Sequence, residues 1–536
     1  MALDPEPCYR AFASRDRRFD GRFVTAVVTT GVYCRPGCPA RLPARRNVRF
    51  YPHAAAAEAA GFRPCLRCRP ETAPGSAAWN GTSATVARAL RLIDEGAMDE
   101  AGVEALAARL GVTSRWLREL FAAQLGASPL AVARTRRVHF ARRLLDTTDL
   151  PLVDIALASG FASARRLHDA FRATFHRSPG ALRRGPAGQI GAIELKVPAR
   201  SPFDMAPLLA FFKARAIPGV EHVTHDAYAR TIRIGEHTGV IEARGISGAA
   251  ALRLGVRVSS PRALLPVAAR VSRMFDLDAD PGAIATHLRR DPALARIVPH
   301  AGVRVPGVWE PFEAGVRALL GQQISVPAAR TLAGRLVRMC GTPLASAGPA
   351  GAGAAGSAGD RAAGHAPAAE RGVAGPGEPA GGARPERDEL IRRMDRHPRI
   401  LATPALSHLF PTPEAVAAAD LERIGLPRAR AASLRAFADA VASGRIAFES
   451  MPDLDTIVVQ LTALPGVGPW TAHYVAMRAV GEPDAFPASD LGVRKALARA
   501  GRMPSEREVL RRAERWRPWR AYAVIALWTR PEKETS

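Results

Sequence analysis

The stretch LPGVGPWTAHYVAMRAVGEPDAFPASD, residues 464–490, joins a glycine turn to the carboxylate of Asp490 in a strongly helical part of the chain. Gly466 and Gly468 permit a tight turn, and the N–H groups that open the following helix form a cradle for a phosphate. Asp490 stands directly before an amphipathic segment, Leu491–Ala500, which we expect to be a helix. On these residues alone a helix N-cap is the simpler interpretation of Asp490.

The complete string Leu464–Ala472 resembles the hairpin of the helix-hairpin-helix DNA glycosylases. Pro311–Val326 and Glu514–Trp528 resemble further segments of one subfamily, the 3-methyladenine DNA glycosylase II (AlkA-like) enzymes. By its position after the hairpin, Asp490 then corresponds to that family's catalytic aspartate. An alkylated base is already a good leaving group, so the reaction needs a carboxylate that stabilises an oxocarbenium-like sugar and helps a water molecule to attack.

Two departures from related glycosylases narrow the subtype. Trp470 stands where bifunctional members carry a Schiff-base lysine, and no cysteine follows Cys340, so the iron–sulfur loop of the endonuclease III branch is missing. The resemblance therefore implies a monofunctional enzyme. It also implies an aromatic pocket that stacks on an electron-poor methylated purine, although each of these aromatic residues is as readily explained as core. The pocket residues are Trp470, Tyr474 and Trp528.

One part of the glycosylase resemblance is incomplete. The subfamily fills the gap left by the extruded base with an apolar wedge, and Gln323 stands near the wedge position. Ile324 is adjacent, so the identity of the wedge stays open. With Gly466 and Gly468, Gln323 completes the DNA-binding residues expected in this half of the chain.

Four of the six cysteines form two closely spaced pairs, Cys34-x3-Cys38 and Cys65-x2-Cys68. Short spacing allows both thiolates of a pair to reach one ion, and two pairs complete a tetrahedral four-sulfur site, which favours zinc. The commonest role of such a site is purely structural.

The sequence around these cysteines, with TTGVYCRPGC and AAGFRPCLRC, resembles the N-terminal domain of the Ada family of DNA alkylation-repair regulators over about Asp20–Pro70. In that family the first cysteine of the set, here Cys34, is both a zinc ligand and the irreversible acceptor of a methyl group from a DNA methylphosphotriester. The transfer needs a thiolate at neutral pH, and bound zinc keeps the cysteine sulfur deprotonated. Neighbouring arginines would contact phosphates, and for each of them a solvated basic face is an equal alternative. They are Arg35, Arg41, Arg45 and Arg46.

Leu106–Pro129 and Ile155–Pro179 form an internal repeat with a period of about 50 residues. Each copy predicts a helix, a glycine turn, a serine N-cap and a second helix. Joined by a long helix near Pro129–Leu145, the two units resemble the AraC-type DNA-binding domain, whose second helices enter successive major grooves; the alternative is a generic helical bundle. Those helices should start near Ser114 and Ser163. The candidate DNA contacts are Ser114, Arg115, Arg118, Ser163, Arg165 and Arg166.

Composition and charge agree with a nucleic-acid partner. The 536 residues include 75 Lys and Arg against 50 Asp and Glu, and the net charge of +25 indicates a polyanion partner. The sequence opens without a secretory signal, and no apolar stretch is long enough to cross a membrane, so we expect a cytoplasmic protein. Residues 345–386 contain one Val and no Leu, Ile or aromatic residue, which predicts a disordered insertion.

These features predict a multidomain, mainly α protein. Ile190–Val197 and Thr231–Ile234 are expected to be strands of a small antiparallel sheet, and Phe203–Arg215 a helix between them. The expected domains are a small zinc-bound α+β domain at 1–75, an AraC-type double helix-turn-helix at 82–184, an AlkA-like α+β domain at 188–300 and an all-α helix-hairpin-helix glycosylase domain at 301–532.

The leading hypothesis is a fused sensor of alkylation damage, transcriptional activator and base-excision glycosylase that holds Zn²⁺. We expect it to act as a monomer on double-stranded DNA, both alkylated and promoter DNA, with RNA polymerase as a further partner. In one alternative the glycosylase-like half only binds DNA, against which Asp490 and the aromatic set argue. In the other alternative the zinc is structural and the protein has only glycosylase activity. The presence of Cys34 within the matched motif argues against this alternative.

Overall fold

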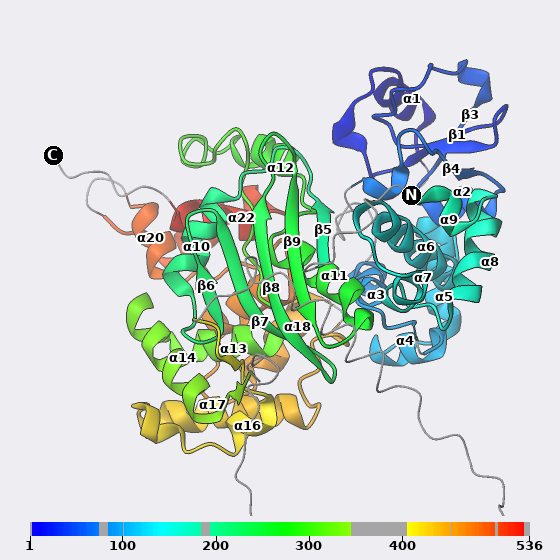
Figure 1. Ribbon diagram of the computed structural model, residues 1–536. Coiled ribbons are helices and arrows are strands. Elements are labelled where there is room, and N and C mark those ends of the chain that lie inside the picture. Colours follow the sequence, from blue (N-terminus) through cyan, green and yellow to red (C-terminus); the bar gives the residue numbers. More distant parts are fainter. Residues whose placement is uncertain are drawn as a thin grey trace, which may run out of the picture.

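The computed structural model describes residues 3–73, 84–99, 101–183, 193–344, 405–451, 453–498 and 502–529. The insertion expected at 345–386 lies outside these residues. The described chain forms a cysteine-bearing N-terminal unit, a helical unit, a unit built on an antiparallel sheet and a helical C-terminal unit (Figure 1). The expected multidomain, mainly α architecture is thereby confirmed. No helix among the described residues is long and apolar enough to cross a membrane.

The N-terminal unit brings the two cysteine pairs together through a small sheet with the strand order β3-β1-β2-β4. β2 ends at Cys34 and runs parallel to β4, which directly precedes Cys65. Cys65 N donates a hydrogen bond to Tyr33 O (2.9 Å), so the two strands place both cysteine pairs at the same end of the sheet. The elements are α1 (Pro5–Ala13), β1 (Val24–Val27), β2 (Val32–Cys34), β3 (Val48–Tyr51), α2 (Ala54–Ala59) and β4 (Arg63–Pro64).

The helical unit contains the predicted repeat. Gly111 (φ +70°) and Gly160 (φ +78°) form the turns between the paired helices. The predicted serine cap is correct for Ser163 and wrong for Ser114, because the first turn is one residue shorter and Thr113 accepts the capping hydrogen bond from Trp116 N. The elements are α3 (Ala84–Asp94), α4 (Val103–Arg109), α5 (Ser114–Leu125), α6 (Pro129–Thr147), α7 (Leu152–Ala158), α8 (Ala164–Phe175) and α9 (Pro179–Leu182).

The third unit is a five-stranded antiparallel sheet with the order β5-β9-β8-β7-β6. The predicted strand Thr231–Ile234 is the second half of β7, and the predicted strand Ile190–Val197 is described from Ile193 onward as β5, its first three residues lying outside the described chain. The sequence did not predict β6, β8 and β9. The helix starts at Ala206 rather than Phe203, because the Asp204 carboxylate accepts a hydrogen bond from Ala206 N and holds a turn there. The elements are β5 (Ile193–Pro198), α10 (Ala206–Arg215), β6 (Glu221–Val223), β7 (Ala227–Ile234), β8 (His237–Gly245), β9 (Ala251–Val258), α11 (Leu264–Met274) and α12 (Pro281–Leu288).

The C-terminal unit is helical apart from one short ladder, β10 paired with β11, which the expected all-α domain did not include. The hairpin joins α18 to α19, and α19 continues into the π-helix η6. The elements are α13 (Pro311–Leu320), α14 (Val326–Cys340), β10 (Thr342–Pro343), β11 (His408–Leu409), α16 (Pro413–Ala417), α17 (Arg428–Ala442), α18 (Leu454–Thr462), α19 (Pro469–Val475), η6 (Ala476–Val480), α20 (Leu491–Ala496), α21 (Glu506–Ala513) and α22 (Arg520–Trp528).

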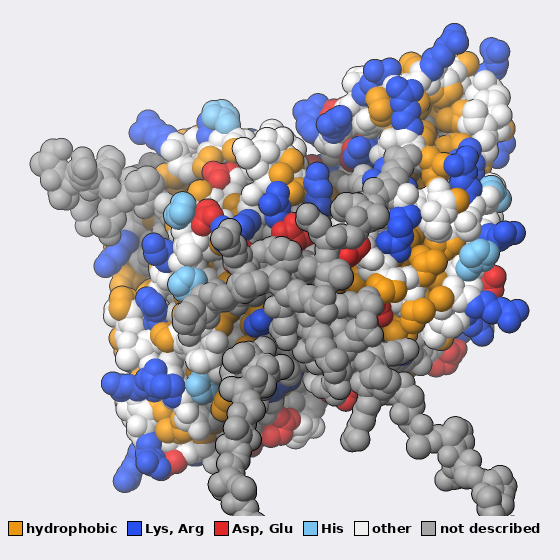
Figure 2. All heavy atoms as spheres, in the orientation of Figure 1, with side chains coloured by type: hydrophobic (Ala, Val, Ile, Leu, Met, Phe, Trp, Pro, Cys, Tyr) orange, Lys and Arg blue, Asp and Glu red, His pale blue; other side chains and the backbone are white. Residues whose placement is uncertain are grey.

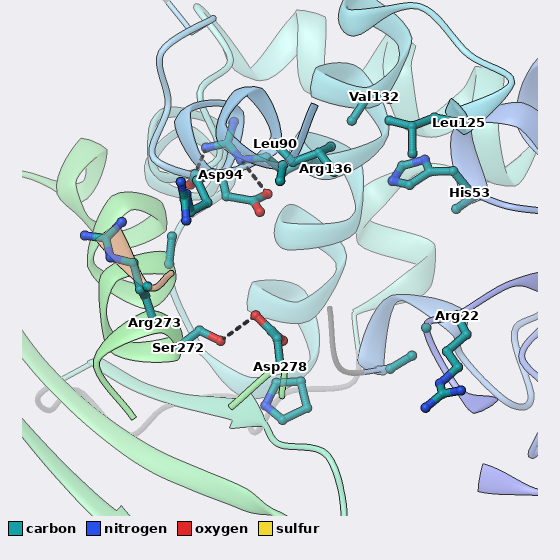
Figure 3. A pocket seen from close by; sticks show the side chains of 18 of the residues that line it. Arg22, His53, Leu90, Asp94, Leu125, Val132, Arg136, Ser272, Arg273 and Asp278 are labelled. Carbon is teal, nitrogen blue, oxygen red and sulfur yellow. Dashed lines mark hydrogen bonds and ion pairs between the residues drawn. The ribbon is translucent and has the colours of Figure 1, made fainter. Parts of the chain in front are cut away.

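The units are packed against one another. One continuous cluster of buried apolar side chains runs from α6–α9 through the sheet to the C-terminal helices. A partly buried polar cluster joins the N-terminal unit to α6: Tyr33 Oη donates to Glu58 Oε1 (2.8 Å), which lies 3.2 Å from His139 Nε2, and Thr135 Oγ1 donates to Glu58 Oε2. At the junction lies a cavity of about 820 Å³ lined by residues of all four units (Figure 3).

The surface carries the excess of positive charge that the sequence predicts. On the face drawn in Figure 2, Lys and Arg side chains outnumber Asp and Glu and are spread over the molecule rather than gathered in one patch. Charge alone therefore does not locate the nucleic-acid interface.

Candidate active sites and nucleic-acid interface

Asp490 lies at the start of α20 and is held by partners from three elements. Its Oδ1 accepts hydrogen bonds from Val493 N and from Trp528 Nε1, both at 2.8 Å, and its Oδ2 accepts one from Trp470 Nε1 at 2.8 Å. The residue is only 9% exposed. The helix N-cap and the glycosylase interpretation therefore do not exclude each other, because Asp490 caps α20 and also joins the two predicted pocket tryptophans.

The three predicted pocket aromatics form one array. Trp470 and Tyr474 lie one turn apart on α19, and their rings stack with centroids 5.3 Å apart and planes inclined by 19°. The ring of Trp528 from α22 is tilted by 39° to Tyr474, with a centroid distance of 6.2 Å. All three side chains are half-buried at the edge of the core. Aromatic rings of this kind can stack on a planar base, and Asp490 is hydrogen-bonded to both tryptophans of the array.

Arg478 is a member of this site that the sequence interpretation missed. It follows Tyr474 by one turn, in the π-helix η6, and its Nη1 donates to Tyr474 Oη (2.7 Å). Its guanidinium also donates to the carbonyls of Pro306 and Gly307 and lies 4.8 Å from the ring centroid of Phe211. Burial lowers the pKa of Arg478. The spacing of four residues after Tyr474 was the available indication.

The hairpin depends on its first glycine. Gly466 has φ +73°, and a Cβ at this position would lie 2.1 Å from Ser433 Oγ, so a larger residue does not fit. Gly468 is the N-cap of α19, and no atom lies within 4 Å of the position that its Cβ would take. Gly468 therefore leaves the backbone open to an approaching phosphate, whereas Gly466 is required by the turn itself.

The turn between α13 and α14 is tied to this hairpin. Gln322 Nε2 donates to Gly466 O (2.9 Å) and to Thr471 Oγ1 (3.0 Å). The next residue, Gln323, is exposed and has φ +57°, a left-handed conformation that is uncommon outside glycine. Ile324 is half-buried. Of the two wedge candidates, Gln323 and Ile324, Gln323 is therefore the exposed one. Gln322, the residue before it, ties the turn to the hairpin.

The four clustered cysteines fit a tetrahedral metal site. Their sulfur atoms all lie within 4.8 Å of one another, and all four residues are buried. Tetrahedral zinc with bonds of about 2.3 Å to sulfur requires sulfur atoms at this kind of separation. Exposure does not single out an acceptor, because Cys34 is 6% exposed and Cys65 is 9% exposed. The cysteines are Cys34, Cys38, Cys65 and Cys68.

The arginines near this cluster differ in their environments. Arg41 and Arg46 are exposed. Arg45 is half-buried, lies 3.4 Å from a Glu6 carboxylate oxygen and covers the rings of Tyr9 and Phe50. Arg35 forms an ion pair with buried Asp20 at 3.0 Å. Arg41 and Arg46 are therefore free to reach a phosphate without giving up an internal contact, and the DNA contact predicted for Arg45 stays a prediction.

The predicted recognition helices present polar and basic side chains. Arg115 and Arg165 are exposed, Arg115 is 3.0 Å from Glu119, and the Ser163 cap is exposed at the start of α8. Ser114 Oγ accepts a hydrogen bond from Arg118 (3.2 Å).

Trp116 is an exposed residue that the sequence interpretation overlooked. It lies in the first turn of α5, and 43% of it is exposed. A large aromatic side chain on this surface can contact apolar base edges such as the thymine methyl group.

The comparisons with known proteins agree with this division of the chain. Residues 7–71 match the metal-binding domain of Ada, 106–185 a helix-turn-helix domain, 194–310 the AlkA N-terminal domain and 390–520 the HhH-GPD superfamily of base excision DNA repair proteins. The chain is 41% identical to the probable bifunctional transcriptional activator/DNA repair enzyme AlkA of Mycobacterium tuberculosis, over 99% of this chain and 97% of that protein.

Two further relatives each match one half. DNA-3-methyladenine glycosylase 2 of Escherichia coli is 30% identical over 61% of this chain and 94% of that protein. The bifunctional transcriptional activator/DNA repair enzyme Ada of the same organism is 40% identical over 27% of this chain and 39% of that protein. The front of the chain is thus similar to a regulator and the back to a glycosylase, as the motifs indicate.

Proposed function

Because this chain belongs to the family of bifunctional transcriptional activator/DNA repair enzymes of the AlkA type, we propose that it combines three activities on DNA. It accepts methyl groups from DNA methylphosphotriesters, activates transcription once methylated, and excises alkylated bases by hydrolysis of the N-glycosidic bond. The observation that carries the proposal is the placement of Asp490 between Trp470 and Trp528 in a chain that also holds a four-cysteine site. We keep 1–75, 82–184, 188–300 and 301–532 as the proposed domain boundaries.

In the proposed excision step, the alkylated purine is rotated out of the duplex and stacks against the aromatic array. Asp490 faces the sugar and stabilises the positive charge that develops as the glycosidic bond breaks, and a water molecule completes the hydrolysis. Trp470 occupies the position of the lyase lysine and has no amine. We therefore expect a monofunctional enzyme whose product is an intact strand with an abasic site.

In the proposed methyl transfer, Cys34 Sγ attacks the methyl carbon of the phosphotriester. A sulfur–carbon bond forms, the carbon–oxygen bond breaks and the DNA keeps an ordinary phosphodiester anion. Bound Zn²⁺ would keep the four cysteine sulfurs deprotonated. Arg41 and Arg46, both exposed, would hold the flanking phosphates.

The direct test of the glycosylase proposal is the release of free methylated base from alkylated duplex DNA by the purified protein. We expect free 3-methyladenine and an unbroken strand, with no adduct trapped by borohydride. A trapped adduct would show that an amine attacks the sugar, and the absence of base release would favour the alternative in which this half only binds DNA.

Methylation of Cys34 is expected to tighten promoter binding by about fivefold at low salt, equivalent to about 1 kcal/mol. Four thiolates around a divalent ion carry a formal charge of −2, and one methyl group leaves −1, so the face beside the DNA phosphates is repelled less. The measurement compares the promoter affinities of methylated and unmethylated protein across salt concentrations. Equal affinities at low salt would contradict an electrostatic switch.

Gln322→Glu is expected to slow base excision by about fivefold. The substitution removes the two hydrogen bonds that tether the turn to the hairpin, which should raise the activation free energy by about 1 kcal/mol. Single-turnover excision rates measure this effect. Gln460→Glu, on the exposed face of α18, makes the same change in charge and serves as the control. An equal effect of the two substitutions would show that only the added charge matters.

A further inference from the structure

Two arginines of the helical unit reach into the C-terminal unit and hold the ends of its helix-hairpin-helix. Arg88 and Arg91 lie on one face of α3, a single turn apart. Arg88 Nη1 donates to the carbonyl oxygens of Glu449, at 3.0 Å, and Met451. Arg91 Nη1 donates to Val480 O at 2.6 Å. Both contacts join residues more than 300 positions apart in the sequence.

The carbonyls that these arginines contact lie at the two ends of one structural element. Glu449 and Met451 lie in the segment before α18, the helix that enters the hairpin and begins at Leu454. Val480 is the last residue of η6, the continuation of α19, and Gly481 ends the helix with φ +74°. Arg91 thus places a cation at a helix C-terminus, where it satisfies a terminal carbonyl and interacts favourably with the helix dipole.

The helix that Arg91 caps carries the base pocket. α19 and η6 supply Trp470, Tyr474 and Arg478, and Trp470 is a hydrogen-bond partner of Asp490. Val480, Trp470 and Tyr474 therefore belong to one continuous helical segment. Arg88 restrains the entry into α18, which packs against α19.

The junction itself is buried and charged. Arg88 is 4% exposed, and burial lowers the pKa of Arg91 to about 10, which leaves it charged at neutral pH. Arg91 lines the cavity in Figure 3, together with Leu90 and Asp94 of α3 and Ser272 and Arg273 of α11. A second set of contacts, separate from the hairpin, joins α3 to α11 here: Glu95 pairs with Arg270 (3.5 Å) and with Arg273.

We propose that Arg88 and Arg91 are positioning residues of the glycosylase, so that the helix-turn-helix half of the chain is a structural part of the base-excision site. This inference rests on the proposed glycosylase function and deepens it. Neither arginine touches the substrate in this arrangement; each acts by fixing backbone carbonyls that set the placement of α18 and α19–η6.

The test compares Arg88→Ala, Arg91→Ala and Arg91→Lys with the unchanged full-length protein, under single-turnover conditions with enzyme in excess over alkylated duplex. We expect the Arg88→Ala and Arg91→Ala rates to fall by about 10-fold to 10²-fold, since displacement of a reacting group by about 1 Å has effects of this size. Arg91→Lys keeps a donor and a charge, and should restore most of the rate.

Arg22→Gln is the matched control, because it breaks the ion pair between the N-terminal unit and Asp280 at the start of α12 without touching the hairpin. Its rate should stay close to that of the unchanged protein. Alanine variants that excise as fast as the unchanged protein would overturn the proposal. So would an equal loss in Arg22→Gln, which would show that general docking of the units against one another is what matters.

Amide hydrogen exchange supplies a readout that does not depend on activity. In Arg88→Ala and Arg91→Ala we expect faster exchange in peptides covering 454–480, and unchanged exchange in α17 of the same domain. Uniform acceleration, or none, would overturn the positioning role. If the unchanged protein releases no base, the glycosylase proposal fails, while the exchange experiment still decides whether the arginines hold the hairpin.

Discussion

Asp490→Asn is expected to reduce the single-turnover rate of base excision on the order of 10²-fold or more, because the transition state loses the negative charge that stabilises the developing oxocarbenium-like sugar. Asparagine has nearly the same size and is as good an N-cap as aspartate, so α20 should keep its start. Affinity for duplex DNA with an abasic-site analogue should change far less, since phosphate contacts dominate binding.

The structure sets the control for this experiment. Asp490 accepts from Val493 N as a cap and from two tryptophan side chains, so a loss of activity could in principle come from the cap alone. Asp4 is an exposed cap in the N-terminal unit, where it accepts a hydrogen bond from Glu6 N (3.0 Å) at the start of α1. Asp4→Asn makes the same change at a helix cap outside the glycosylase unit and should therefore excise at a nearly unchanged rate. Near-normal excision by Asp490→Asn would show that Asp490 only caps its helix.

The hairpin, the aromatic array and the cysteine pairs could be predicted from the sequence, because each depends on residues that lie close together along the chain. The hairpin needs a residue with positive φ at Gly466, the aromatic array needs Trp470 and Tyr474 one turn apart, and the cysteine pairs need short spacing. Each is a local requirement. The cap of α5 shows the limit of this reasoning, because Thr113 and Ser114 are both plausible caps and a turn shorter by one residue decides between them.

Contacts across the chain could not be predicted in the same way. Nothing in the sequence distinguishes Arg88 and Arg91 from the other arginines of this arginine-rich chain. Their acceptors are backbone carbonyls, which every residue has, so the sequence does not identify these acceptors either. The same holds for Arg45, whose aromatic neighbours are apparent only in the fold. Gln322 and Gln323 are identical neighbours, and only the structure separates the tether from the exposed tip.

Incubation with DNA that carries methylphosphotriesters is expected to add one methyl group per chain, on Cys34, and Cys34→Ser is expected to abolish this transfer entirely. A serine hydroxyl is not ionised at neutral pH and is a far weaker nucleophile than a thiolate. Peptide mass spectrometry identifies the modified residue. Zinc content, measured alongside, shows whether the three remaining cysteines still hold the metal.

Cys65 is the rival acceptor, because it is buried no more deeply than Cys34 and all four sulfurs lie within 4.8 Å of one another. What favours Cys34 is its position as the first cysteine of the set, at the end of β2, in the segment that matches the metal-binding domain of Ada. Cys340→Ser, which removes a half-buried cysteine outside the cluster, should leave transfer unchanged and controls for non-specific thiol methylation. Methyl on Cys65 of the unchanged protein would reassign the acceptor within the same metal site. One ion would activate all four sulfurs, so the direction from which the phosphotriester approaches would decide which sulfur reacts.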